Sequence, residues 1–178
     1  MLAWQQFRDA SNMTDEIAAL AQLCQTDTEE RKMAIRDFYA KWQTQTLVMN
    51  KWLAVQAGSK LKNTLGEVMD LEKCPAYDPK NPNKIRSLVG VFAHNLPRFH
   101  DVSGAGYRYV ADKILEIDAF NPHVAGRLAT AFRQYGKLDE TRRGLAQAEL
   151  ERILGDKKLS PNVYEIISKT VGHSKTTR

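Results

Sequence analysis

NPNKIRSLVGVF, residues 81–92, has the pattern of a helix start followed at once by a packing face. Asn81 can cap a helix, and Pro82 suits the first helical position because its missing N–H would have no helical partner there. Apolar residues then recur with the spacing of one helix stripe, at Ile85, Leu88, Val89 and Phe92. This stretch therefore predicts a capped helix with one buried face.

The same opening returns forty residues later, as Asn121-Pro122-His123. A second apolar stripe follows it, through Val124, Leu128, Ala131, Phe132 and Tyr135. Each copy also has an arginine inside the helix, Arg86 in the first and Arg127 in the second. A recurrence of about forty residues is typical of HEAT or armadillo arrays, in which helix pairs stack on one another.

The remaining segments also have helical patterns, and none shows the sustained alternation of a strand. Capping-box signals occur at Thr26–Glu29 and at Thr64–Glu67, while Lys73–Lys80 and Asn95–Ala105 have the composition of loops. We therefore predict an all-α fold, a HEAT/armadillo-like superhelical array of antiparallel helix pairs, although a helix bundle is also compatible with the pattern. The expected organisation is a lead-in at residues 1–10, one helical-repeat domain at 11–172 and a disordered tail at 173–178.

Composition excludes several classes of protein. The 178 residues are enough for one sizeable core, and nothing approaches the ~18 consecutive apolar residues of a membrane span. Of the net charge of +5, Lys157–Arg178 carries +4, so the excess is terminal and gives no basic stripe for nucleic acid. The start has no signal-peptide pattern, and we expect a cytoplasmic protein that binds neither membrane nor nucleic acid.

No catalytic or metal-binding motif is present in the sequence. The four histidines form no HExxH, and Cys24 and Cys74 have no metal-type spacing. The candidate functional residues are instead Arg86 and Arg127, because small neighbours on their helices leave room for a guanidinium to bind carboxylates, bidentately where geometry permits. On the residues alone, two ordinary surface arginines explain the pattern better than a binding pair does.

Several runs of residues resemble the C-terminal end of the bacterial aminopeptidase N family, the zinc-dependent alanyl aminopeptidases of the gluzincin type. The resemblance covers roughly residues 12–169, with the runs in the family's order and spacing. It is carried by Asn12–Asp15, Leu47–Trp52, Asn81–Phe92, Ser103–Tyr107, Asn121–Leu128 and Leu159–Glu165.

The resemblance implies a non-catalytic helical domain that walls the active-site chamber of a peptidase and controls the entry of peptides. Zinc would belong to an upstream catalytic domain of the same polypeptide, where the family has HExxH and GxMxN, both absent here; this chain would then be inactive alone. The resemblance also implies that Arg86 and Arg127 face the chamber and contact peptide substrates. The resemblance leads us to expect an aspartate where this sequence has Asn50, so that position is assigned no role.

Two further possibilities follow from these patterns. One is a stand-alone helical-repeat scaffold that binds a protein partner on its concave face. The other is self-association of the isolated fragment, because a solenoid cut at its end exposes the apolar face that the missing repeats would cover.

Overall fold

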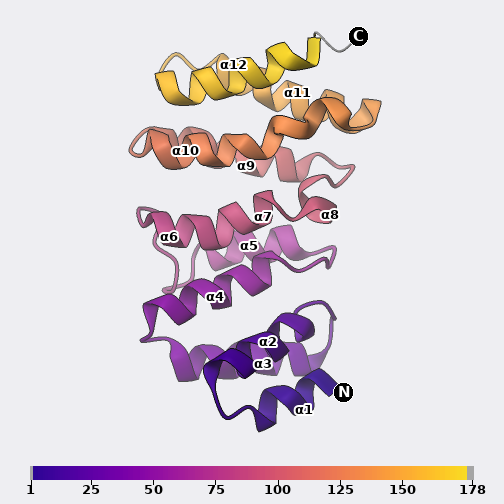
Figure 1. The fold of residues 1–178 in the computed structure, drawn as a ribbon, viewed down its shortest axis with the longest axis vertical. Helices are drawn as coiled ribbons and strands as arrows, with labels where there is room; N and C mark the ends of the chain where they lie inside the picture. Colours follow the sequence, from indigo (N-terminus) through magenta and orange to yellow (C-terminus); the bar gives the residue numbers. More distant parts are fainter. Residues whose placement is uncertain (1, 176–178) are drawn as a thin grey trace. The chain divides into compact units, whose positions relative to one another are not determined.

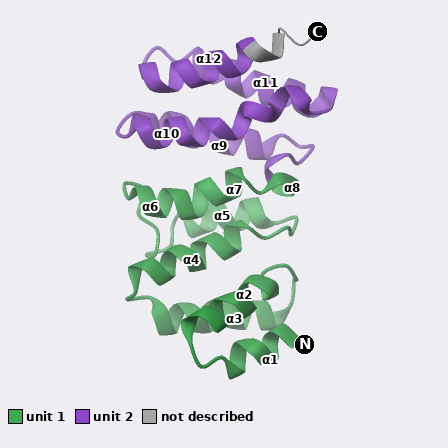
Figure 2. Cartoon of the chain, in the orientation of Figure 1, with its two compact units in different colours: residues 1–98 green, residues 99–178 purple. Residues whose placement is uncertain are grey.

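The computed structural model describes residues 2–175, with side chains described as far as residue 172, and in this part of the chain it contains helices and no strand (Figure 1). The all-α prediction is therefore confirmed. No helix in the described part is both long enough and apolar enough to cross a membrane. The chain divides into two compact units, Met1–Arg98 and Phe99–Arg178 (Figure 2).

In the first unit, helices that follow one another along the chain pack together, so that α1 contacts α2 and α2 contacts α3. The helix α4 contacts both α5 and the π-helical segment Arg86–Gly90. The predicted stripe from Ile85 to Phe92 is fully buried. In the view of Figure 1, α5 lies behind α4 and α6. The elements are α1 (Leu2–Asp9), α2 (Met13–Leu23), α3 (Glu29–Trp42), α4 (Thr46–Ala57), α5 (Thr64–Leu71), α6 (Pro82–Ile85), a π-helical turn η1 (Arg86–Gly90), α7 (Val91–Ala93) and, at its end, α8 (Leu96–Phe99).

Buried polar bonds hold this first unit together. Arg31 of α3 makes a two-pronged ion pair with Glu67 of α5, with 3.0 Å between Nη1 and Oε1. Asn95 donates from Nδ2 to the carbonyls of Ala57 (3.0 Å) and Ser59 (2.7 Å). Ser59 Oγ donates in turn to the carbonyl of Cys24 at 2.6 Å. The thiol of Cys24 is fully buried, and this burial raises its pKa to about 11.

The second unit packs α9 against α10, α10 against α12, and α11 against both α9 and α12. An aromatic cluster forms part of its core, with ring centroids 5.1 Å apart for Phe99 and Tyr107 and 5.3 Å apart for Phe99 and Phe132. The buried carboxylate of Asp118 accepts hydrogen bonds from the backbone N–H and the hydroxyl of Ser160. The elements are α9 (Ala105–Asp118), α10 (Pro122–Ala129), a 3₁₀ helix η2 (Thr130–Lys137), α11 (Glu140–Leu154) and α12 (Pro161–Lys175).

The ends of the chain differ from the sequence prediction. Most of the expected lead-in, residues 1–10, is the helix α1, which packs on α2 through the buried ring of Phe7. The expected tail, residues 173–178, begins inside α12, which reaches Lys175; residues 176–178 lie outside the described part of the chain.

Both predicted capping boxes are wrong. The cap of α3 is Thr28, whose hydroxyl accepts from the N–H of Arg31, while the Thr26 hydroxyl donates to the carbonyl of Leu23. Thr64 lies inside α5 and donates to the carbonyl of Ser59. The carboxylate expected to complete the second box, Glu67, is bound to Arg31 instead. Tertiary contacts thus compete successfully with the local pattern.

Candidate functional site

The two Asn-Pro openings form the caps that the sequence predicts. Asn81 Oδ1 accepts from the backbone N–H of Asn83 at 3.0 Å, and Asn121 Oδ1 accepts from that of Val124 at 3.2 Å. Proline occupies the first turn in both helices. Each cap satisfies one of the N–H groups that a helix start leaves without a partner. The segments that carry the two candidate arginines therefore start in the same way.

Arg86 begins the π-helical turn η1 and is exposed. The stem of its side chain lies over Gly90, where an added Cβ would be 3.6 Å from Arg86 Cγ. No hydrogen bond or ion pair holds its guanidinium among the residues that the structure describes. The small neighbour predicted from the sequence thus does support the stem, and the charged end is available to a ligand.

Arg127 is also exposed, on α10, but it lies one residue further from its cap than Arg86 does. The residue forty positions after Arg86 is Gly126, which is buried against α12. An added Cβ at Gly126 would lie 2.6 Å from Asn162 Nδ2 and 2.9 Å from Ile166 Cδ1. Since successive helical residues are about 100° apart, the two arginines leave different faces of their helices. Within the described residues, the guanidinium of Arg127 also lacks a partner.

Sequence reasoning overlooked a second feature of these helices, which is that they contain no Asp or Glu. In the described part of the chain the helical carboxylates lie on α1, α2, α3, α5, α9, α11 and α12, and α9 and α11 lie behind α10 and α12 in Figure 1. Counting acidic residues helix by helix would have found this pattern. The acid-free segments, with their cations, are α4 (Lys51), α6–η1–α7 (Lys84 and Arg86), α8 (Arg98) and α10–η2 (Arg127, Arg133 and Lys137).

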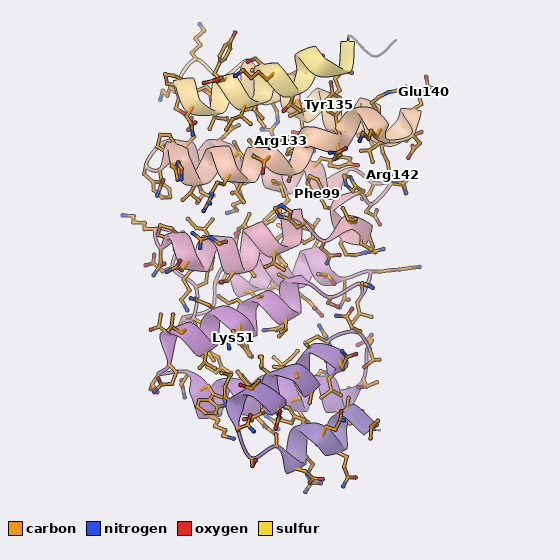
Figure 3. The ribbon with its side chains drawn as sticks, viewed as in Figure 1. Lys51, Phe99, Arg133, Tyr135, Glu140 and Arg142 are labelled. Atoms are coloured by element: carbon orange, nitrogen blue, oxygen red, sulfur yellow. The ribbon has the colours of Figure 1, made fainter. Side chains whose placement is uncertain are left out.

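These cations are not equally accessible. Lys51 of α4 and Arg133 of η2, both labelled in Figure 3, are exposed. Lys84 is only 6% exposed, donates to the carbonyl of Thr46 at 3.5 Å, and has its pKa lowered by burial. Lys84 is therefore part of the interior, and the accessible cation of α6–η1–α7 is Arg86.

Two of the histidines, His94 and His100, have structural partners. His94 Nδ1 lies 2.8 Å from the carbonyl of Gly90, and His100 Nδ1 lies 2.9 Å from the hydroxyl of Tyr107. Burial, and secondarily the charge of Arg142, lowers the pKa of His100. Across the described residues, no three His, Cys, Asp or Glu side chains come together as metal ligands. Arg86 and Arg127, as exposed guanidinium groups, are suited to electrostatic binding of anionic groups.

Comparison with known proteins places this fold in a family. A family model described as a domain of unknown function (DUF3458_C), ARM repeats, matches residues 1–172. The chain is 41% identical over 167 residues to aminopeptidase N of Caulobacter vibrioides and 39% identical over 171 residues to that of Haemophilus influenzae. These matches cover 93% and 96% of this chain, but only 19% and 20% of the relatives.

A solved structure agrees with these matches. The crystal structure of Legionella pneumophila aminopeptidase A in complex with aspartic acid matches 97% of this chain and 20% of its own, with a TM-score of 0.90 and 32% identity. The resemblance to aminopeptidase N that the sequence runs indicated is thereby confirmed, as is the helical-repeat architecture. The chain spans about a fifth of the length of these relatives.

Proposed function

The chain belongs to the DUF3458_C family of ARM-repeat domains, and from this premise we propose that it is the C-terminal, non-catalytic domain of a zinc aminopeptidase of the aminopeptidase N type. The observation that carries the proposal is the similarity over nearly all of this chain to about a fifth of each aminopeptidase. The remaining four-fifths of such a polypeptide would contain the catalytic residues. The natural partner of this domain is then the upstream part of its own polypeptide, acting in the cytoplasm.

In this proposal the domain walls the chamber in which the amino-terminal residue of a peptide is removed, and it governs which peptides enter. Arg86 and Arg127 would contact the substrate. Both are exposed, their guanidinium groups have no partner among the described residues, and no carboxylate on their own helices competes for them. A guanidinium can bind a carboxylate through two parallel hydrogen bonds, or a peptide carbonyl through one.

The zinc ion belongs to the rest of the enzyme in this scheme. No cluster of His, Cys, Asp or Glu among the described residues offers ligands for zinc, and in this proposal the residues of the domain act on the peptide. Their contribution is to orient the peptide and to restrict access. Such contacts act on binding of the longer substrate, and hence on kcat/KM.

The test uses the full polypeptide with Arg86→Ala, Arg127→Ala and both changes together. We expect an alanyl chromogenic substrate to be hydrolysed as by the wild type, because it is too short to reach the arginines. Longer peptides should lose about tenfold in kcat/KM, or ~1.4 kcal/mol of transition-state binding. Arg36→Ala, which removes an exposed arginine of α3, is the matched control.

Equal hydrolysis of short and long substrates by all variants would refute the role of the two arginines. The same polypeptide also discriminates the scaffold alternative, since an aminopeptidase requires an HExxH segment upstream of this domain. Unchanged melting temperatures would show that the variants report on binding and not on folding.

A further inference from the structure

The second unit contains a groove between η2 and α12 whose lining includes neither Arg86 nor Arg127. Its volume is about 470 Å³, within the ~300–1,000 Å³ that is usual for small-ligand sites. Arg133 of η2 forms one side, and α12 supplies the other through Glu165, Ile166, Lys169 and Thr170. Figure 3 shows Arg133 on η2, beside α12.

Most polar groups of this groove are already bonded. Lys169 Nζ is 2.5 Å from Glu165 Oε1, so the carboxylate and the ammonium neutralise each other. The hydroxyl of Thr170 donates to the carbonyl of Ile166 at 2.8 Å. Arg133 is exposed, and within the described residues its guanidinium makes no hydrogen bond or ion pair. The groove therefore combines one unpaired guanidinium with the apolar side chain of Ile166.

Charge indicates which ligand suits this arrangement. The α10–η2 segment has no carboxylate that could reach Arg133 along its own helix, and the acid of α12 is bound to Lys169. The planar guanidinium matches a carboxylate group in geometry as well as in sign. The side chains of the last six residues, HSKTTR, include a lysine and an arginine and no acidic group, so these side chains offer Arg133 no anionic partner.

We propose that this groove binds the C-terminal carboxylate of a peptide, with Arg133 pairing to the carboxylate and Ile166 contacting the last side chain. The inference rests on the proposed function, because it takes peptides as the ligands of this domain. It adds a peptide-binding site on η2 and α12 to the two arginines described above. Peptides with a free carboxyl end would be retained by the domain in preference to peptides with a blocked end.

The experiment measures peptide binding to the full polypeptide by calorimetry. The probes are two N-acetylated alanine-leucine pentapeptides that differ only in ending as a carboxylate or as an amide, since the acetyl group prevents aminopeptidase cleavage. We expect the carboxylate form to bind about tenfold more tightly. Arg133→Gln should abolish this difference, whereas Lys137→Gln, which removes an exposed cation from the same 3₁₀ helix, should preserve it. Hydrogen exchange should show protection of residues 130–137 and 161–172 when the carboxylate peptide is added.

Equal affinity for the two peptides, or an equal loss in both variants, would overturn the proposal, because binding would then be absent or due to diffuse charge. A gain of tenfold on deleting residues 173–178 would also overturn it, by showing that the chain's own end occupies the groove. These outcomes are separate from failure of the proposed function, which is decided by the peptide kinetics of the Arg86 and Arg127 variants.

Discussion

The two Asn-Pro helices start alike and continue differently. After the Asn81 cap the helix widens into a π turn at Arg86–Gly90, whereas after the Asn121 cap it tightens into the 3₁₀ helix Thr130–Lys137. The position five residues after the cap is the exposed Arg86 in one and the buried Gly126 in the other. The cap is a local signal that can be repeated, but the helix packed alongside decides which face remains available to a ligand.

The largest expected effect concerns the end of the first Asn-Pro helix, where Asn95 bridges two buried carbonyls. Asn95→Ala removes both hydrogen bonds and should lower the free energy of unfolding by about 2 kcal/mol, since buried acceptors lose their donor. Urea denaturation measures the loss. Asn83→Ala, in the first turn of α6 and exposed, should stay within about 0.5 kcal/mol. A similar loss in both variants would show that Asn95 has no special role.

Replacing a glycine with alanine should change the stability of the protein in opposite directions in the two helices. Gly126→Ala places a methyl group against Asn162 and Ile166 and disturbs the 2.7 Å bond from Asn162 to the carbonyl of Pro122. We expect a net loss of about 1–2 kcal/mol from overpacking. Gly90→Ala meets only ordinary contacts and should gain about 0.5–1 kcal/mol from helix propensity. Thermal unfolding that shifts in the same direction for both would contradict the difference between the two faces.

Replacing either capping asparagine with alanine should lower the free energy of unfolding by a similar amount, in contrast to the opposite effects expected at the glycines. Asn81→Ala and Asn121→Ala each remove one side-chain bond to a first-turn N–H and should cost about 1 kcal/mol. Chemical denaturation of both variants under one set of conditions tests this. A loss confined to one variant would mean that the repeated opening is not a repeated energetic unit.

The smallest effect is the pH dependence of stability that His100 should give to the second unit. The pKa of His100 is lowered by burial and by Arg142, and Asp139, Tyr107 and Asp101 are the other titratable groups near this arginine. Because the folded pKa lies below the ordinary 6.5, the stability contribution is present above that value and is lost as pH falls through the folded pKa. His100→Gln should reduce this loss of stability, measured as the fall in melting temperature between pH 7 and pH 5. An unchanged fall in melting temperature would show that other titratable groups cause the loss of stability.

Much of this fold can be predicted from the sequence because its signals are local. The Asn-Pro caps and the stripe from Ile85 to Phe92 depend on neighbours within two turns, and both were found. Thr64 and Glu67 were misjudged because their partners, Ser59 and Arg31, are chosen by tertiary packing. The departures from α-helical geometry at η1 and η2 carried no recognised sequence signal.

The role of the two candidate arginines stays a prediction, but their placement can be compared with the sequence. Arg86 and Arg127 are exposed and available, but the sequence comparison treated them as equivalent because both follow the same opening. Their faces differ because Arg127 lies one residue further on, and because α12 covers the face of Gly126. The acid-free helices could have been found by counting. The groove beside Arg133 could not, since it depends on how η2 and α12 pack.

Because Cys24 is buried, the rate at which its thiol is alkylated can report how often the first unit opens. With no exposed surface and a pKa near 11, this thiol reacts at neutral pH only in molecules whose α2 has separated from its neighbours, whereas the half-buried Cys74 reacts from the closed state. The slow phase of labelling by an alkylating reagent then measures the opening equilibrium of the first unit around Cys24. Mass spectrometry distinguishes this label from the label on Cys74. Peptides that bind the first unit would slow the alkylation of Cys24, and peptides that bind only the second unit would leave its rate unchanged.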